Sequence, residues 1–177
     1  MDIECFVGLS IGKWRSMRSG HSLAFQHFEE VLSEITIRAL SDSDPKVHNM
    51  LSEYNNVKVM PLPTSPFEMC WEAESDWEPD NPDQASSGSC ILLPIPENHS
   101  KGIILRSIGY AEAERATSKY EFQPDGTFIL QTEYEHSVTE ERIWFVSNNV
   151  RCRSSVVKTL QGTGILQTSF ASEVRRI

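Results

Sequence analysis

The chain has 177 residues, of which 39% are hydrophobic and 23% are charged, and its formal net charge is −9. This length and composition predict one soluble domain, spanning 1–177, that can bury a substantial core. The acidic balance argues against nucleic acid and an anionic membrane as partners, and no apolar run approaches the ~20 residues of a membrane-spanning helix.

The N-terminus and the cysteines indicate a reducing compartment. The first residues, MDIECFVGLSIG, are acidic and lack the positively charged start of a secretory signal peptide. The four cysteines are widely spaced and form no CxxC pair, so neither a zinc knuckle nor a redox pair is indicated. We therefore expect free thiols and a cytosol-like location.

Apolar periodicity predicts a short amphipathic helix over residues 2–9. A second helix is expected to begin after Asp44, whose side chain can cap it, with Pro45 at its first position. Alternation of apolar and polar residues predicts short strands in the rest of the chain. They cover 14–19, 21–25, 31–40, 67–77, 89–95, 102–110, 116–123, 127–136 and 165–174, together with two strands within 140–157.

Many of these strands are separated only by turns, of which Pro124-Asp125-Gly126 is the clearest. Many short strands with little helix favour a barrel or a sandwich over an α/β fold, and successive hairpins favour a meander closed into a barrel. A barrel of eight to ten strands can hold one small ligand. The predicted fold class is therefore an all-β antiparallel barrel with a short N-terminal helix and one further helix.

The strand over 67–77 has two different faces. One face carries Phe67, Met69, Trp71, Ala73, Ser75 and Trp77, and the other carries Glu68, Cys70, Glu72, Glu74 and Asp76. An aromatic face opposite an acidic face is typical of a sheet with one side against the core and the other in water. We expect the aromatic face to line the barrel interior.

The stretch 140–157 is expected to form two strands joined by a tight turn at Asn148-Asn149, because Asn tolerates positive φ. In the second strand, alternation places Arg151, Arg153 and Ser155 on one face. These arginines either face water, which composition alone favours, or point into a cavity and bind an anion. A buried site of that kind needs carboxylates from the chain or from a ligand.

The sequence lacks the common catalytic motifs, with no GxSxG, no GxxxxGK[ST] and no GxGxxG. Its five histidines show no HxH or HExxH spacing, so no metal site built from protein ligands is expected. What remains is a binding cavity with aromatic walls, guanidinium groups and carboxylates. The expected ligand is apolar and flat, and it carries carboxylates.

Several short segments carry a more specific signal. They are GKWRSMRSGH at 12–21, the Trp71…Trp77 strand, GIILR at 102–106 with Gly109-Tyr110, ERIWF at 141–145, VRCRSS at 150–155 and SEVRR at 172–176. In this order and spacing they resemble the S-type phycobiliprotein lyases, the CpcS/CpeS family, along nearly the whole chain. Gly12-Lys13-Trp14 also resembles the GxW signature of lipocalins, in which the Trp closes one barrel end. In lipocalins a late arginine often stacks on that Trp, and Arg175 or Arg176 is expected to do so here.

The resemblance implies a ten-stranded lipocalin-like barrel in the cyanobacterial cytosol or the plastid stroma. It implies a lyase whose substrate is a linear tetrapyrrole, phycocyanobilin or phycoerythrobilin, bound transiently and not as a permanent cofactor. The bilin is passed to a cysteine of an apo-phycobiliprotein subunit of the phycocyanin, allophycocyanin or phycoerythrin type, as a thioether at ring A. The resemblance does not decide whether the protein forms a homodimer.

By motif match, the resemblance places functional positions at Arg18, His21, Trp71, Trp77, Glu141, Arg151, Arg153 and Ser155. Arg18, Arg151 and Arg153 are expected to hold the bilin propionates bidentately. We expect Arg151 to lie deepest, because it is near the turn and beside Glu141 across the hairpin. Trp71, Trp77 and Met69 are expected to stack on the pyrrole rings.

Two residues are expected to act in the chemistry. Glu141 would pair with a protonated pyrrole nitrogen, a role that falls to Asp76 if a bulge turns it inward. His21 would assist proton transfer, or it is an ordinary histidine at the rim. Cys152 lies on the face of its strand opposite Arg151 and Arg153, which argues against a covalent adduct between the lyase and the bilin.

Two other functions remain open. The same barrel would serve a non-enzymatic carrier or chaperone that stores or delivers a bilin. A barrel filled by its own side chains would instead serve as an interaction module.

Overall fold

The computed structural model describes residues 1–23, 25–54, 62–75, 87–107, 116–161 and 164–176. These residues include ten strands and two short helices, joined by turns and loops. In chain order they are α1 (Ile3–Ser10), β1 (Gly12–Ser22), β2 (His27–Ala39), α2 (Pro45–Glu53), β3 (Phe67–Ser75), β4 (Ser87–Pro96), β5 (Lys101–Arg106), β6 (Ala116–Phe122), β7 (Phe128–Glu133), β8 (Ser137–Ser147), β9 (Val150–Thr159) and β10 (Ile165–Arg176).

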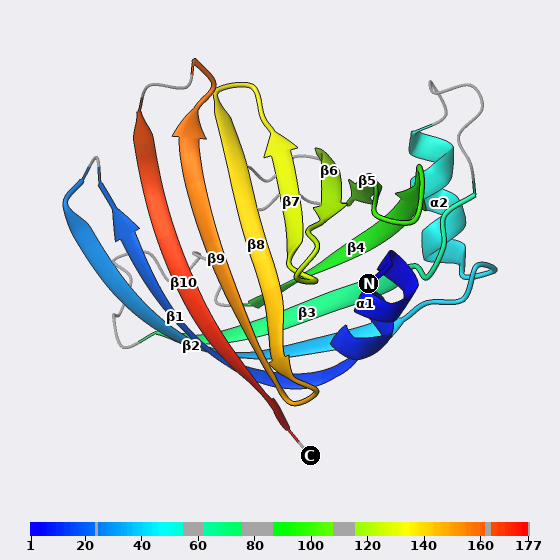
Figure 1. Ribbon diagram of the computed structural model, residues 1–177, viewed down its shortest axis with the longest axis horizontal. Helices are drawn as coiled ribbons and strands as arrows, with labels where there is room; N and C mark the ends of the chain where they lie inside the picture. The colour runs from blue at the N-terminus through cyan, green and yellow to red at the C-terminus, as the bar shows by residue number, and fades with distance from the viewer. Residues whose placement is uncertain (24, 55–61, 76–86, 108–115, 162–163, 177) are drawn as a thin grey trace.

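The strands form a closed antiparallel barrel in which each strand pairs with its neighbours in sequence and β10 pairs with β1 (Figure 1). Closure leaves no unpaired sheet edge. The predicted ten-stranded barrel with an N-terminal helix and one further helix is confirmed. The hairpin turn between β8 and β9 falls at Asn148 and Asn149, as expected, but neither residue adopts the positive φ on which that expectation rested.

The strand predicted over 21–25 is wrong. His21 and Ser22 end β1, and β2 begins at His27. Gln26 adopts a positive φ of 51°, so the chain reverses there. The apolar residues that suggested alternation do not reach the core, since Leu23 is 48% exposed and Phe25 is 85% exposed.

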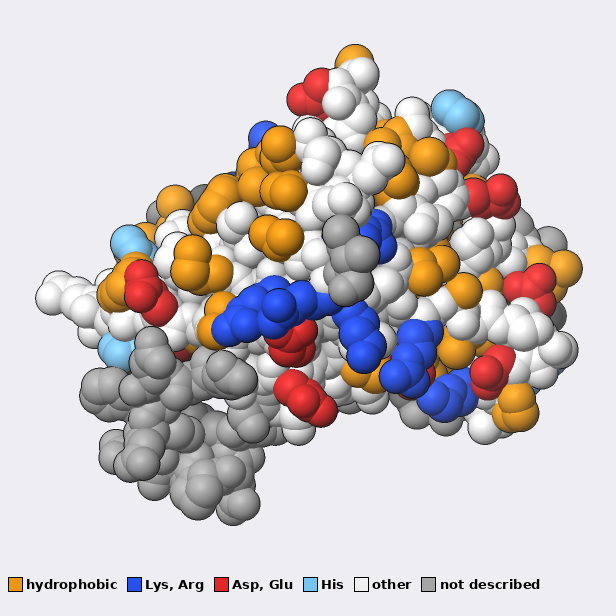
Figure 2. Space-filling view, turned by 90° about the horizontal axis from the view of Figure 1, so that it is seen from below, with side chains coloured by type: hydrophobic (Ala, Val, Ile, Leu, Met, Phe, Trp, Pro, Cys, Tyr) orange, Lys and Arg blue, Asp and Glu red, His pale blue; other side chains and the backbone are white. Residues whose placement is uncertain are grey.

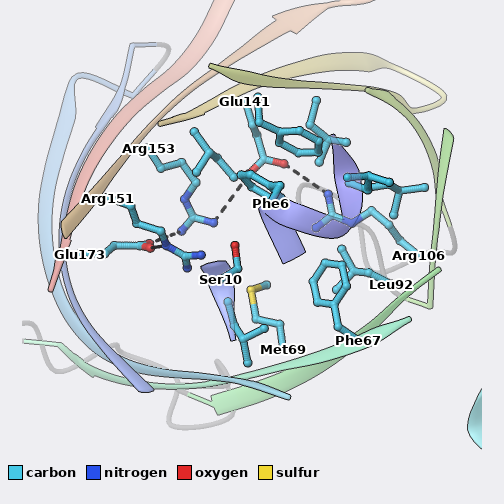
Figure 3. Close-up of a pocket in the computed structure, with 16 residues that line it drawn as sticks. Phe6, Ser10, Phe67, Met69, Leu92, Arg106, Glu141, Arg151, Arg153 and Glu173 are labelled. Atoms are coloured by element: carbon cyan, nitrogen blue, oxygen red, sulfur yellow. Dashed lines mark hydrogen bonds and ion pairs between the residues drawn. The ribbon is translucent and has the colours of Figure 1, made fainter. Parts of the chain in front are cut away.

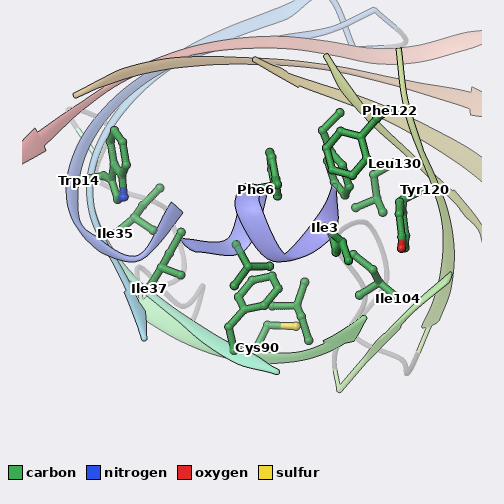
Figure 4. Packing of buried hydrophobic residues seen from close by; sticks show 14 residues of the cluster. Ile3, Phe6, Trp14, Ile35, Ile37, Cys90, Ile104, Tyr120, Phe122 and Leu130 are labelled. Atoms are coloured by element: carbon green, nitrogen blue, oxygen red, sulfur yellow. The ribbon is translucent and has the colours of Figure 1, made fainter. Parts of the chain in front are cut away.

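Helix α1 lies inside the barrel and forms the centre of its core (Figure 4). The Asp2 carboxylate caps the helix by accepting a hydrogen bond from Cys5 N at 2.9 Å. Ile3 and Phe6 are buried, and the Phe6 ring stacks on Phe128 with centroids 4.2 Å apart. The helix is too short to be stable alone, so its conformation depends on this packing.

Trp14 fixes the end of α1 at the bottom of the barrel. Its indole is fully buried, and its Nε1 donates to the carbonyl of Ser10 at 2.8 Å. The guanidinium of Arg175 lies over the indole at 4.2 Å and donates to the carbonyls of Leu9 and Ile11. Arg175, and not Arg176, is therefore the stacking arginine that the lipocalin resemblance indicated.

Helix α2 covers the outer face of β4 and β5. Its Val47 and Met50 pack against Leu93, Ile95 and Leu105 in a second apolar cluster. These two strands are therefore buried on both faces. No helix in the described part of the chain has the length and apolar character needed to cross a membrane.

The outer face of β1 and β10 carries cations near the C-terminal end of the chain. Lys13 and Arg15 project outward from β1, and the register pairs Lys13 with Arg176 of β10. All three are exposed. Seen from below, Lys and Arg side chains form a band across the molecule with apolar side chains beside it (Figure 2). The net negative charge of the chain is thus unevenly distributed.

Candidate functional site

A pocket inside the barrel is enclosed by α1 on one side and by inward-facing side chains of several strands on the others (Figure 3). Most of its lining is apolar. The residues that line it are Ile3, Phe6, Ser10, Ile37, Phe67, Met69, Leu92, Ile104, Arg106, Phe128, Leu130, Glu141, Ile143, Arg151, Arg153 and Glu173.

Five charged side chains of the pocket form a chain of alternating sign. Arg106 Nη1 lies 3.3 Å from Glu141, and Glu141 lies 3.8 Å from Arg153. Arg153 also lies 3.6 Å from Glu173, which accepts a hydrogen bond from Arg151 Nε. The exposed fraction of these side chains ranges from 1% for Glu173 to 16% for Arg153. Among the described residues of the lining, three guanidinium groups face two carboxylates, which sum to a formal net charge of +1.

Three of these side chains, those of Glu173, Arg151 and Arg106, have pKa values shifted by burial and by their charged neighbours. Burial alone would raise the pKa of the Glu173 carboxyl, but the charges of Arg151 and Arg153 outweigh it and the pKa lies below its ordinary value of 4.5. Burial lowers the pKa of Arg151, against the opposing effect of Glu173. For Arg106, burial lowers the pKa, but Glu141, with Cys90 and Tyr134, raises it by more, so the net shift is upward. An arginine titrates too high for such shifts to remove its charge near pH 7.

Arg151 and Arg153 point into the pocket, as Figure 3 shows. The alternative that they face water is therefore wrong. The expectation that Arg151 lies beside Glu141 across the hairpin is also wrong. The register of β8 and β9 places Arg151 opposite Phe145, and it places Glu141 opposite Ser155. Arg153, and not Arg151, is the residue that contacts Glu141.

Residues 2–176 match the model of the CpeS-like protein family. The chain belongs to this family. It is 51% identical over 177 residues to chromophore lyase CpcS/CpeS 3 of Trichodesmium erythraeum strain IMS101, with 99% of each chain covered. It is 44% identical to the provisionally named phycoerythrobilin lyase CpeS of Microchaete diplosiphon, with 100% of this chain and 79% of that protein covered.

The barrel is also similar to a solved structure of this family. The S-type phycobiliprotein lyase CPES from Guillardia theta superposes with a TM-score of 0.83 at 35% identity. The comparison covers 100% of this chain and 94% of that chain. The similarity extends to the whole barrel, including α1.

The structure brings only part of the expected CpeS-like site together in one pocket. Met69, Glu141, Arg151 and Arg153 line it. Trp71 is the next inward residue after Met69 on β3, is partly buried, and packs against the core cluster. Its indole covers Gly88 of β4, where a Cβ would lie 2.3 Å from Trp71 Cζ2.

Three further expected residues lie elsewhere, and one cannot be placed. Ser155 follows Arg153 on the inner face of β9, where its hydroxyl lies 2.7 Å from that of Ser169. Arg18 forms an ion pair with Glu29 at 2.8 Å and does not line the pocket. His21 is exposed on the outer face of β1, in edge contact with Phe28, so the geometry gives no support to a role in proton transfer. Trp77, like Asp76, lies outside the described residues.

Among the pocket residues to which sequence reasoning gave no role in the site are Phe6 and the three polar residues Ser10, Arg106 and Glu173. Arg106 shares its parity on β5 with the buried Ile104, but Leu105 of the opposite parity is buried as well, so alternation gave no signal for an inward position. Glu173 and Arg106 both fall within the segments that carry the family resemblance. Nothing in the amphipathic pattern of α1 indicated that the helix would enter the barrel.

Proposed function

We propose that this chain is a chromophore lyase that binds a phycobilin in the barrel and attaches it to a cysteine of a phycobiliprotein subunit. Its membership of the CpeS-like family supports the reaction. The observation that carries the binding step is the surplus positive charge of a buried pocket, where three guanidinium groups meet two carboxylates. A bilin propionate would neutralise that charge through charge-assisted hydrogen bonds.

Arg153 is the guanidinium best suited to hold a propionate. Its side chain is 16% exposed, against 6% for that of Arg151, so a ligand that enters the barrel can reach it more readily. Arg151 is already hydrogen-bonded to Glu173 and lies over Trp14 at 4.6 Å. We therefore assign Arg153 to the ligand and Arg151 mainly to holding Glu173 in place.

The size of the pocket indicates which part of the bilin it holds. Its free volume is about 60 Å³. A buried water needs roughly 10–15 Å³ by the same measure, so the pocket accepts a carboxylate side arm and not a whole tetrapyrrole. The ring system would extend past Met69 and Arg153 toward the next inward residues of their strands, Trp71 and Ser155, where Trp71 offers a stacking surface.

The thiol that forms the thioether would come from the partner subunit. Among the described residues, the pocket lining includes no cysteine, and Cys152 lies on the outer face of β9 opposite Trp144. The share of this chain in the reaction is then to position the bilin and exclude competing reactions. Glu141 keeps lone pairs beyond those facing Arg106 and Arg153, with which it can accept from a pyrrole N–H.

The first bilin to test is phycoerythrobilin, because the Microchaete diplosiphon relative carries that name. The purified chain would be mixed with the bilin and an apo-phycobiliprotein subunit, and the subunit would then be denatured in acidic urea. A lyase leaves visible absorbance on the denatured subunit, above the level of a control without the chain. A subunit that loses all colour on denaturation, although the chain binds bilin, would support a carrier instead.

A further inference from the structure

Among the described residues, four buried side-chain polar atoms have no hydrogen-bond partner: Ser10 Oγ, Arg106 Nε, Tyr120 Oη and Thr139 Oγ1. Buried polar groups are almost always paired, so each unpaired one requires an explanation. Two of the four residues, Ser10 and Arg106, line the same pocket, whereas Tyr120 and Thr139 do not. A pocket that awaits a ligand explains the first two.

Ser10 is the last residue of α1 and is 2% exposed. Its position is fixed from both sides, because its carbonyl accepts from Trp14 Nε1 and the neighbouring carbonyl of Leu9 accepts from Arg175. Its hydroxyl points into the pocket on the side of Arg151 and Arg153 (Figure 3). The helix end thus presents a rigid, unpaired hydroxyl next to the surplus positive charge.

Arg106 lies on the opposite side of the pocket, on β5, and is 4% exposed. Its Nη1 is paired with Glu141 at 3.3 Å, while its Nε carries a hydrogen that no described group accepts. An arginine nitrogen can only donate, so its missing partner is an acceptor. In a pocket of net positive charge that acceptor is an oxygen of an anionic ligand.

We infer that Ser10 Oγ and Arg106 Nε are ligand contacts: each donates a hydrogen bond to an oxygen of the bound bilin. Ser10 Oγ donates to the carboxylate that Arg153 holds, and Arg106 Nε donates to a second oxygen at the β5 side of the pocket. This inference rests on the proposed function and extends it, because it makes α1 part of the binding site and not only a plug of the barrel.

The decisive variant is Ser10→Ala, which should weaken bilin binding without lowering the stability of the ligand-free protein. Removing an unpaired buried hydroxyl leaves the stability of the ligand-free protein unchanged or increases it. The same change should weaken phycoerythrobilin about tenfold in a visible-absorbance titration. Thr139→Val is the matched control, since it removes an equally buried, unpaired hydroxyl outside the pocket. It should behave like Ser10→Ala in urea unfolding and bind the bilin like the parent.

Arg106→Lys tests the second contact. Lysine retains a positive charge for Glu141 but removes the Nε–H group, so the bilin should again bind about tenfold more weakly. Arg142→Lys is the control, because Arg142 Nε pairs with Glu140 at 2.9 Å on the exterior. That exchange should leave bilin affinity unchanged.

The outcomes separate this inference from the function on which it rests. Weaker binding by Ser10→Ala and Arg106→Lys, with both controls at the parent value, supports it. If the parent binds bilin and Ser10→Ala binds it equally well, the inference is overturned and the proposed function stands. If the parent binds no bilin at all, the proposed function fails, and the inference fails with it.

Discussion

At the scale of single residues, the two arginines of β9 have different tasks. Arg151 is 5% exposed, donates to Glu173 and lies over Trp14. Arg153 is further from both of its carboxylates and is the more exposed of the pair. This reverses the expectation that Arg151 would bind the ligand more strongly, because that expectation placed Arg151 beside Glu141.

Arg153→Gln should therefore weaken the natural bilin far more than its dimethyl ester. A hydrogen bond to a charged group contributes about 1.5–3 kcal/mol, which corresponds to a loss of about tenfold to a hundredfold for the free acid. The ester offers no carboxylate, so its affinity should change little. Both ligands are titrated by visible absorbance against parent and variant. Equal losses for acid and ester would show that the residue does not bind a propionate.

Glu173 should make stability depend on pH in the acid range. Its pKa is lowered in the folded protein, so its contribution is complete above its ordinary pKa of 4.5 and is lost as the pH falls through the folded value. Glu173→Gln leaves Arg151 buried without its partner and should cost about 3–5 kcal/mol near pH 7. The difference in unfolding free energy between parent and variant should shrink below pH 4.5.

Urea denaturation from pH 7 down to pH 3 measures that difference. Glu133→Gln is the control, since the Glu133 side chain is 59% exposed and only 4.0 Å from Lys119. It should have little effect at any pH. A parent–variant difference for Glu173→Gln that stays constant over the whole range would contradict the assignment.

At the scale of elements, α1 is held in the barrel by its C-terminal end and by its apolar face. Trp14 and Arg175 bind carbonyls at its C-terminal end, and Phe6 packs against Phe128 near its middle. The short helix therefore forms the floor of the pocket. Its placement depends on contacts from β1, β7 and β10.

Trp14→Ala should lower stability more than it lowers bilin affinity. Truncating a buried aromatic residue costs about 3–5 kcal/mol, and here it also removes the donor to Ser10 O. Unfolding in urea and bilin titration measure the two effects. Trp144→Ala is a suitable comparison, because Trp144 lies on the outer face of β8, where its ring centroid is 6.1 Å from that of Phe170. If Trp14→Ala unfolds like the parent, Trp14 does not close the barrel.

Gly88→Ala tests whether Trp71 belongs to the bilin site without removing its indole ring. A Cβ at position 88 would lie 2.3 Å from Trp71 Cζ2, so the indole must move from its present position on β3. If that indole stacks on a pyrrole, bilin affinity should fall by about tenfold, within the 1–3 kcal/mol typical of an aromatic contact in a pocket. Gly8→Ala is the control, since a Cβ there meets nothing within 4 Å. Parent-like affinity for Gly88→Ala would remove Trp71 from the site.

How far the sequence predicted the site depends on the strand. On β3 the aromatic face points inward and the alternation rule holds. On β10 alternation predicts the wrong inner face, because the apolar Phe170 and Val174 are about half exposed while the charged Glu173 is buried. On β5 it carries no information, since Ile104 and Leu105 are both buried. Composition alone therefore misplaced the polar interior, and the family resemblance was needed to place Arg151 and Arg153 inside.

At the scale of the whole molecule, the charge of the pocket opposes the charge of the chain. The chain carries a net charge of −9, whereas the described charged residues that line the pocket sum to +1. The overall field repels an anionic bilin, and an esterified bilin escapes that repulsion. A preference for the free acid would therefore have to come from local positive charge, and the buried guanidinium groups of the pocket supply it.

The most direct test of this account is a titration of the unmodified protein with phycoerythrobilin as the free acid and as the dimethyl ester, followed by visible absorbance. If the pocket binds a propionate, the free acid should bind at least about tenfold more tightly, in spite of the net negative charge of the protein. Equal affinities, or tighter binding of the ester, would contradict the claim that the arginines of the barrel interior hold the bilin by its carboxylates.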